Sequence, residues 1–156
     1  MSNLIITPAP FDLVKFMDGV FKIIPGEHDP RNDNLTEIDF SKVDFVHCLA
    51  KGETSITGEE KLARLKADNR IRYGATVFMG LWNDYQARKE ESVLETLYRT
   101  EKIDSIDFFG DVLLGPDGDP YVLCLYRGDT NWLRQWNWLG RSWLRERLSA
   151  VFRLQC

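Results

Sequence analysis

Residues 106–127 constrain the fold of this chain most, because they have the pattern of a β-hairpin. Two runs rich in β-branched, aromatic and leucine side chains, 106–114 and 120–127, flank a turn that contains Asp117-Gly118. Glycine adopts the positive φ that such a turn needs, and the turn then follows the right-handed twist of the strands. The segment therefore predicts two antiparallel strands joined by a tight connection.

The middle of the chain carries the signatures of three short helices. Thr57 and Ser92 are each followed three residues later by a glutamate, the capping-box pattern that satisfies free backbone N–H groups where a helix begins. Apolar residues over 77–85 recur at the spacing of one helix face. Upstream, the turn formers of 25–34 predict a loop, and the β-branched and aromatic run 43–49 predicts a buried strand.

These elements fit a single α+β domain over residues 1–156, with strands and helices in 1–104 and the hairpin and a tryptophan-rich segment in 105–156. The 156 residues, 44% of them hydrophobic and 28% charged, indicate a soluble globular domain. The N-terminus has no signal-peptide pattern and no stretch could cross a bilayer, so we expect a cytoplasmic protein without membrane contact. The widely spaced Cys48, Cys124 and Cys156 are expected to be free thiols.

Charge and tryptophan are concentrated at the C-terminal end of the chain. Residues 127–156 hold six arginines, two acidic residues and four of the five tryptophans. This segment is therefore net positive, although the whole chain carries a net charge of -4. We expect recognition of a partner to involve this segment.

The sequence holds no pattern that predicts catalysis, a metal site or a cofactor. His28 and His47 are the two candidate bases; His28 lies in the polar loop, and strand alternation turns His47 away from its neighbour Cys48. The histidines and cysteines do not cluster, and the glycines follow no phosphate-loop order. We therefore expect a protein that is not an enzyme, and a small enzyme of unfamiliar type is the least favoured hypothesis.

The tryptophan-rich segment 132–145 allows two interpretations. As a helix it would bury tryptophans on one side and place arginines on the other. As a strand it would sort alternate side chains to opposite faces. Gly140 and the high β-propensity of tryptophan favour a strand near 131–139 followed by a loop. Strand alternation then puts three tryptophans on one face, Trp132, Trp136 and Trp138, and three replaceable residues on the other, Leu133, Gln135 and Asn137.

A family resemblance covers residues 35–152 and is carried mainly by the C-terminal half. The Phe-Phe-Gly-Asp-Val-Leu-Leu run, the Pro-Asp-Gly turn and above all the Trp-Leu-Gly-x-x-Trp motif at 138–143 resemble a family of uncharacterised proteins from small prokaryotic genomes. That family is similar to the variable proteins of diversity-generating retroelements. Those proteins display residues rewritten by adenine-directed reverse transcription on a C-type lectin-like domain.

The resemblance implies a C-type lectin-like fold and non-catalytic ligand binding, without a cofactor. It implies a ligand-binding surface of Leu133, Gln135, Asn137, Arg141, Leu144, Arg145, Glu146 and Arg147, all of which except Arg145 are positions that the family varies. It also implies the scaffold aromatics Trp132, Trp136, Trp138 and Trp143. Arginines with aromatics nearby suit a macromolecular ligand, for which we favour a protein. A nucleic-acid-binding module that uses the same arginines and tryptophans is the alternative. The oligomeric state is left open.

Overall fold

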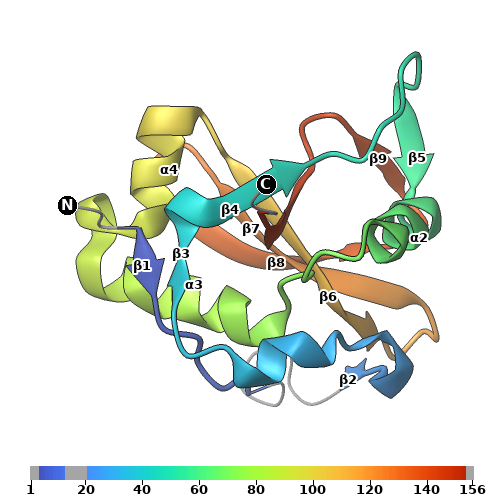
Figure 1. The fold of residues 1–156 in the computed structure, drawn as a ribbon, viewed down its shortest axis with the longest axis horizontal. Coiled ribbons are helices and arrows are strands. Elements are labelled where there is room, and N and C mark those ends of the chain that lie inside the picture. Colours follow the sequence, from blue (N-terminus) through green and yellow to red (C-terminus); the bar gives the residue numbers. More distant parts are fainter. Residues whose placement is uncertain (1–3, 13–20, 154–156) are drawn as a thin grey trace.

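The computed structural model describes residues 4–12 and 21–153 and shows a mixed α/β fold around a six-stranded sheet (Figure 1). Its strands are β2 (Lys22–Ile23), β4 (Val43–Val46), β6 (Ser105–Leu114), β7 (Pro120–Arg127), β8 (Trp132–Trp138) and β10 (Leu148–Phe152). They lie in the order β4-β10-β6-β7-β8, and β2 pairs with the end of β6. β10 runs parallel to β6, whereas the other neighbouring pairs are antiparallel. The expected C-terminal antiparallel sheet of the hairpin and the strand near 131–139 is present as β6, β7 and β8. The parallel strand β10 was not expected from the sequence.

Two small sheets and the helices complete the described part of the fold. β1 (Ile5–Ile6) pairs with β3 (Ile38–Asp39), and β5 (Ser55–Thr57) pairs with β9 (Ser142–Leu144). The α-helices are α2 (Gly58–Asp68), α3 (Ala75–Arg88) and α4 (Val93–Glu101). The 3-10 helices are η1 (Pro25–Glu27), η2 (Pro30–Asn34), η3 (Phe40–Lys42) and η4 (Lys89–Glu91). No helix in the described ranges is both long enough and apolar enough to cross a membrane.

Most of the expected elements are confirmed. The Thr57 hydroxyl accepts a hydrogen bond from the Glu60 N–H at 3.1 Å, and α2 begins at the next residue. Ser92 caps α4 in the same way, and β6 and β7 form the expected hairpin. The predicted loop 25–34 consists mainly of the two short 3-10 helices η1 and η2. The strand expected over 43–49 ends earlier, at Val46, because Cys48 adopts a φ of 66°, which a β-strand does not allow.

The six-stranded sheet is covered by different elements on its two faces. Helices α3 and α4 pack on one face, where Phe78, Leu94 and Phe108 are fully buried in the larger apolar core. Helix α2 and strand β9 pack on the other face, where Leu65 and Trp143 belong to a second, smaller core. Because the smaller core covers only part of its face, the rest of that face is left for polar side chains. Figure 1 shows α2 and β9 gathered at one end of the sheet.

The tryptophan-rich segment is a strand, as predicted, but its aromatic face is not a buried wall. Trp132 is 1% exposed and lies in the larger core, as expected of a scaffold residue. Trp136 and Trp138 share its face yet are 40% and 47% exposed, so neither is part of a buried wall. β8 is an edge strand of the sheet in the described residues, and only its Trp132 end lies beneath the helices.

Helix α3 begins with a cap supplied from distant parts of the chain. Its N-cap residue is Gly74, which has no side chain to cap the helix. Instead the Asp111 carboxylate accepts from the Ala75 N–H at 2.7 Å, and the Asn32 side-chain oxygen accepts from the Gly74 N–H at 3.0 Å. His28 Nδ1 lies 2.6 Å from the same Asp111 carboxylate. Loop 25–34 is thereby fixed to both the sheet and the helix.

Because His28 can gain a proton, the contribution of its contact with Asp111 to stability depends on pH. Partial burial works against its charge, but hydrogen bonds and charges of Asp111 and Asp33 outweigh burial and raise the pKa of His28 above 6.5. A raised pKa stabilises the fold fully below the unfolded value, and that stabilisation is lost as pH rises through the folded value. We expect His28→Gln to lower the free energy of unfolding by about 1–2 kcal/mol at pH 6 and by less at pH 8.5. Urea unfolding of the unaltered protein and of His28→Gln at the two pH values tests this expectation. A difference in the free energy of unfolding that is as large at pH 8.5 as at pH 6 would contradict it.

Candidate functional site

A row of polar side chains crosses the sheet on the face that α2 covers only partly. Ser149 on β10 is opposite Asp107 on β6, Asp107 is opposite Cys124 on β7, and Cys124 is opposite Gln135 on β8. Residues directly opposite each other in a sheet point to the same face. Asp107 and Cys124 have no exposed surface, and Ser149 is 1% exposed. A polar strip therefore lies where an apolar core would ordinarily be found.

Arg147 closes over this strip from the segment between β9 and β10. Its Nη2 donates to the Asp107 carboxylate at 2.7 Å and lies 3.2 Å from the Cys124 sulfur. The Arg147 side chain is 15% exposed and that of Asp107 is fully buried. The ion pair is thus a buried one, in which each charge depends on the other for compensation.

Lys61 adds a second buried cation from helix α2. Its ammonium donates to the Arg147 backbone carbonyl at 2.7 Å and lies 5.3 Å from the ring centres of both Phe109 and Trp143. Lys61 has no exposed surface, and this burial lowers its pKa, while the charge of Asp107 opposes the shift. The two cations face one buried carboxylate, so the cluster attracts negative charge.

Trp143 is the aromatic centre of the cluster. The guanidinium carbons of Arg147 and Arg141 lie 5.6 Å and 5.9 Å from its ring centre, within the range of cation–π attraction. Arg141 Nη1 also donates to the Asn137 side-chain oxygen at 2.9 Å. The predicted scaffold role of Trp143 is consistent with its complete burial in the smaller core.

Three buried atoms of the cluster keep unused hydrogen-bonding capacity. They are Asp107 Oδ2, Arg147 Nε and Ser149 Oγ, which have no hydrogen-bond partner among the described residues. Buried polar groups are nearly always paired, so several unpaired atoms at one place mark a site that can accept further polar contacts.

The thiol and imidazole groups near the cluster are poorly suited to nucleophilic chemistry. Burial, reinforced by the Asp107 charge, raises the pKa of Cys124 to about 12, so its thiol stays protonated at neutral pH. Burial and the neighbouring charges of Arg145 and Lys61 lower the pKa of His47. Within residues 4–12 and 21–153, no three histidine, cysteine or acidic side chains are grouped so as to hold a metal ion.

The eight predicted ligand-binding residues form two groups, one in the buried polar cluster and one on the exposed surface above it. Gln135, Asn137 and Arg147 belong to the polar cluster; Asn137 is 6% exposed, so its predicted place in an open display is wrong, and Arg147 is largely buried. The physical reason is that the β9–β10 segment covers this part of the face and ties it down through Arg147. The others are exposed: Leu133, Arg141, Leu144, Arg145 and Glu146. We call this surface, with the cluster beneath it, the arginine face.

Three of the exposed predicted residues lie together beside strand β5. Leu144, Arg145 and Glu146 line a shallow pocket of about 260 Å³ with Glu53 and Thr54. Arg145 Nη1 also lies 3.2 Å from His47 Nε2. The β9–β10 segment thus carries both exposed side chains and the buried Arg147, and the cluster holds the segment in place.

Two central residues of the cluster were not predicted from the sequence. Asp107 is one of two aspartates in the mainly apolar run 106–114, and a charged residue inside such a run is the signal that could have identified it. Lys61 precedes Leu62 in a helix with several charged residues, and its sequence pattern is that of a solvent-exposed lysine. Its burial follows from the packing of α2 against Trp143, which the sequence pattern does not reveal.

Comparisons with known proteins identify no relative of this chain. Neither family models, nor curated proteins, nor solved structures give a match. The relationship to variable proteins of diversity-generating retroelements therefore stays a prediction from the sequence.

Proposed function

We propose that the protein is a non-catalytic binding protein that takes up a protein ligand on the arginine face. The observation that carries this proposal is the pair of exposed arginines, Arg141 and Arg145, held beside a rigid cationic cluster. Neither arginine forms an ion pair with any described residue, so both guanidinium groups can bind ligand carboxylates. The exposed Leu133 and Leu144 add apolar contact area, and arginine is among the residues in which protein interfaces are enriched.

The finer form of the proposal is a C-type lectin-like scaffold with a diversified surface. The exposed positions of the arginine face suit replacement, because their side chains lie at the surface and only Arg141 also contacts buried residues, Asn137 and Trp143. Asn137 and Arg147 do not suit it, because both bind within the buried cluster. Gln135 and Glu146 also differ from the products of adenine mutagenesis at an asparagine codon, which leaves a pyrimidine at the third base. We therefore limit the proposed variable positions to Leu133, Arg141 and Leu144.

Binding of a labelled oligoglutamate peptide, followed by fluorescence anisotropy, tests the proposed function. We expect the double variant Arg141→Gln, Arg145→Gln to bind the peptide at least about tenfold more weakly, because two charge-assisted contacts are lost. The matched control Lys22→Gln, Arg99→Gln removes the same charge from exposed residues elsewhere and should leave affinity nearly unchanged.

Two results would contradict this proposal. One is equal loss of peptide affinity in the arginine and control variants, which would show a response to net charge alone. The other is tighter binding of a labelled single-stranded oligonucleotide than of the peptide, with an affinity that falls steeply with salt. That result would favour the nucleic-acid alternative, because release of counterions produces such a salt dependence.

A further inference from the structure

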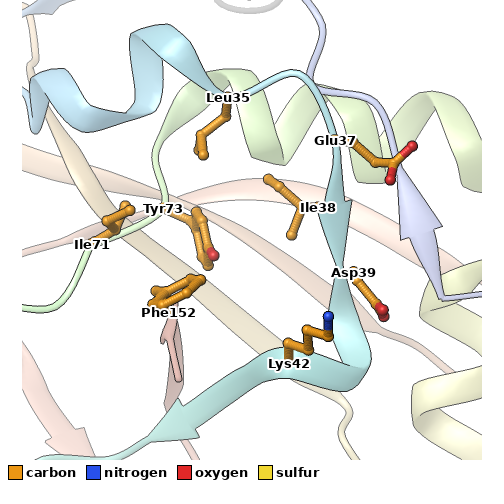
Figure 2. Close-up of a pocket in the computed structure, with 8 residues that line it drawn as sticks. All are labelled: Leu35, Glu37, Ile38, Asp39, Lys42, Ile71, Tyr73 and Phe152. Atoms are coloured by element: carbon orange, nitrogen blue, oxygen red, sulfur yellow. The ribbon is translucent and has the colours of Figure 1, made fainter. Parts of the chain in front are cut away.

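The open pocket at the β3 side of the molecule and the covered polar cluster of the arginine face differ in how their charges are balanced. The pocket lies between β3, η3 and the end of β10, and it carries the Lys42 ammonium with two carboxylates, those of Glu37 and Asp39 (Figure 2). Asp39 and Lys42 attract each other, and the Ser41 hydroxyl also donates to Asp39 at 2.7 Å. The cation of this pocket therefore has partners within the chain.

The polar cluster instead holds an excess of buried positive charge. Asp107 is the carboxylate whose charge acts most on both Lys61 and Arg147. Arg147 forms an ion pair with it at 2.7 Å, whereas Lys61 forms no ion pair with a described carboxylate and donates to the Arg147 backbone carbonyl. One carboxylate balances one cation, and a second buried cation is unfavourable. Lys61 has no exposed surface, so Arg147, whose side chain is 15% exposed, is the cation that can reach water.

The covered cluster is also incompletely hydrogen-bonded. Asp107 Oδ2, Ser149 Oγ and Arg147 Nε are buried without a partner among the described residues. Leaving such atoms buried and unpaired costs free energy, and water can bond to all three once Arg147 moves aside. The closed arrangement therefore carries two unfavourable contributions, surplus charge and unpaired polar atoms, that an open arrangement does not.

Few contacts hold the β9–β10 segment, residues 145–147, over the cluster. All three of its residues are charged, and Arg145 and Glu146 are exposed. Arg147 anchors the segment through its side chain and its carbonyl, and Arg145 Nη1 lies 3.2 Å from His47 Nε2. A segment that is held by a few polar contacts and buries no apolar side chain of its own is typical of a region with low local stability.

We propose that the β9–β10 segment opens locally and closes again, with Arg147 as its latch. In the closed state, which the structure shows, Arg147 binds Asp107. In the open state, a minor population, Arg147 lies in solvent and leaves one buried ammonium with one buried carboxylate. The released guanidinium then joins the two exposed arginines of the arginine face and can bind a ligand carboxylate. This last step rests on the proposed function, whereas the opening itself does not.

Cys124 reports the open state, because polar side chains lie against its sulfur. The sulfur lies 3.2 Å from Arg147 Nη2 and 3.9 Å from both Gln135 Nε2 and Ser105 Oγ. Cys124 has no exposed surface, and burial raises the pKa of its thiol to about 12. Alkylating reagents attack the thiolate, so the closed state should not react.

Alkylation by iodoacetamide, followed by mass spectrometry of the peptide that contains Cys124, tests the opening. We expect Cys124 to react at least about tenfold faster than the measured free energy of unfolding allows. The rate should change little with urea below the unfolding transition, because local opening exposes little surface. Arg147→Gln removes the latch charge and should raise the rate at least about tenfold without urea. Glu146→Gln changes an exposed charge on the same segment and is the matched control, with an unchanged rate expected.

Two results would overturn the opening. One is a rate that rises with urea as steeply as global unfolding does, in the unaltered protein or in Arg147→Gln. The other is an Arg147→Gln variant that reacts no faster than the unaltered protein.

Saturating oligoglutamate peptide tests the link with ligand binding. We expect it to raise the Cys124 rate at least about threefold, because a ligand that binds the released Arg147 favours the open state. Peptide binding seen by anisotropy with an unchanged or slower rate would overturn this link. If the peptide does not bind at all, the link fails with the proposed function, while the urea dependence of alkylation still decides whether the segment opens.

Discussion

Replacing Asp107 by asparagine is expected to lower the free energy of unfolding by about 3–5 kcal/mol, because it leaves two buried cations without a compensating charge. The Asp107 side chain is fully buried and accepts from Arg147 at 2.7 Å. Lys61 is equally buried, and Asp107 is the main charge that opposes the lowering of its pKa. Asparagine keeps the size of the side chain, so the loss reports charge rather than a cavity. Urea unfolding monitored by circular dichroism measures the change.

A double-mutant cycle shows whether this loss comes from the ion pair. Arg147→Met in the Asp107→Asn background removes one of the two stranded cations and should recover part of the lost stability. Asp104→Asn is the matched control, because Asp104 is exposed three residues earlier and its change should stay within about 0.5 kcal/mol. An Asp107→Asn variant as stable as Asp104→Asn would refute the view that this cluster is held together by charge.

The elements that could be predicted from the sequence are those determined by local chemistry. Thr57 and Ser92 begin helices because their hydroxyls satisfy backbone N–H groups three residues on, which requires no tertiary contact. The hairpin follows from Asp117-Gly118, and Gly118 adopts the positive φ, 85°, that the turn requires. The strand β8 follows from composition. Each of these signals lies within a few residues of the structure that it determines.

The position of β10 and the contents of the polar cluster could not be predicted in this way. β10 lies between β4 and β6, which are separated from each other by about sixty residues of sequence, and its pairing depends on how these distant strands meet. Strand alternation correctly sorted Gln135 and Asn137 onto one face. It could not show that Arg147 would close over that face, and this covering is why Asn137 is buried. Alternation gives the direction of a side chain, whereas burial depends on what packs above it.

This difference between the direction of a side chain and its burial predicts unequal losses of stability for the two tryptophans of the Trp-Leu-Gly-x-x-Trp motif, Trp138 and Trp143. Trp143 is fully buried and packs edge-to-face on Phe109, with ring centres 5.2 Å apart, so Trp143→Ala should lower the free energy of unfolding by about 3–5 kcal/mol. Trp138 is 47% exposed on the edge strand, and Trp138→Ala should lower it by no more than about 1 kcal/mol. Urea unfolding should be followed by circular dichroism at amide wavelengths, because each substitution also removes a fluorophore. Equal losses would mean that both tryptophans are scaffold, as their shared motif suggests, and would contradict the exposure of Trp138. A large loss at Trp143 alone would show that packing above each residue decides its role, because the two side chains are chemically identical.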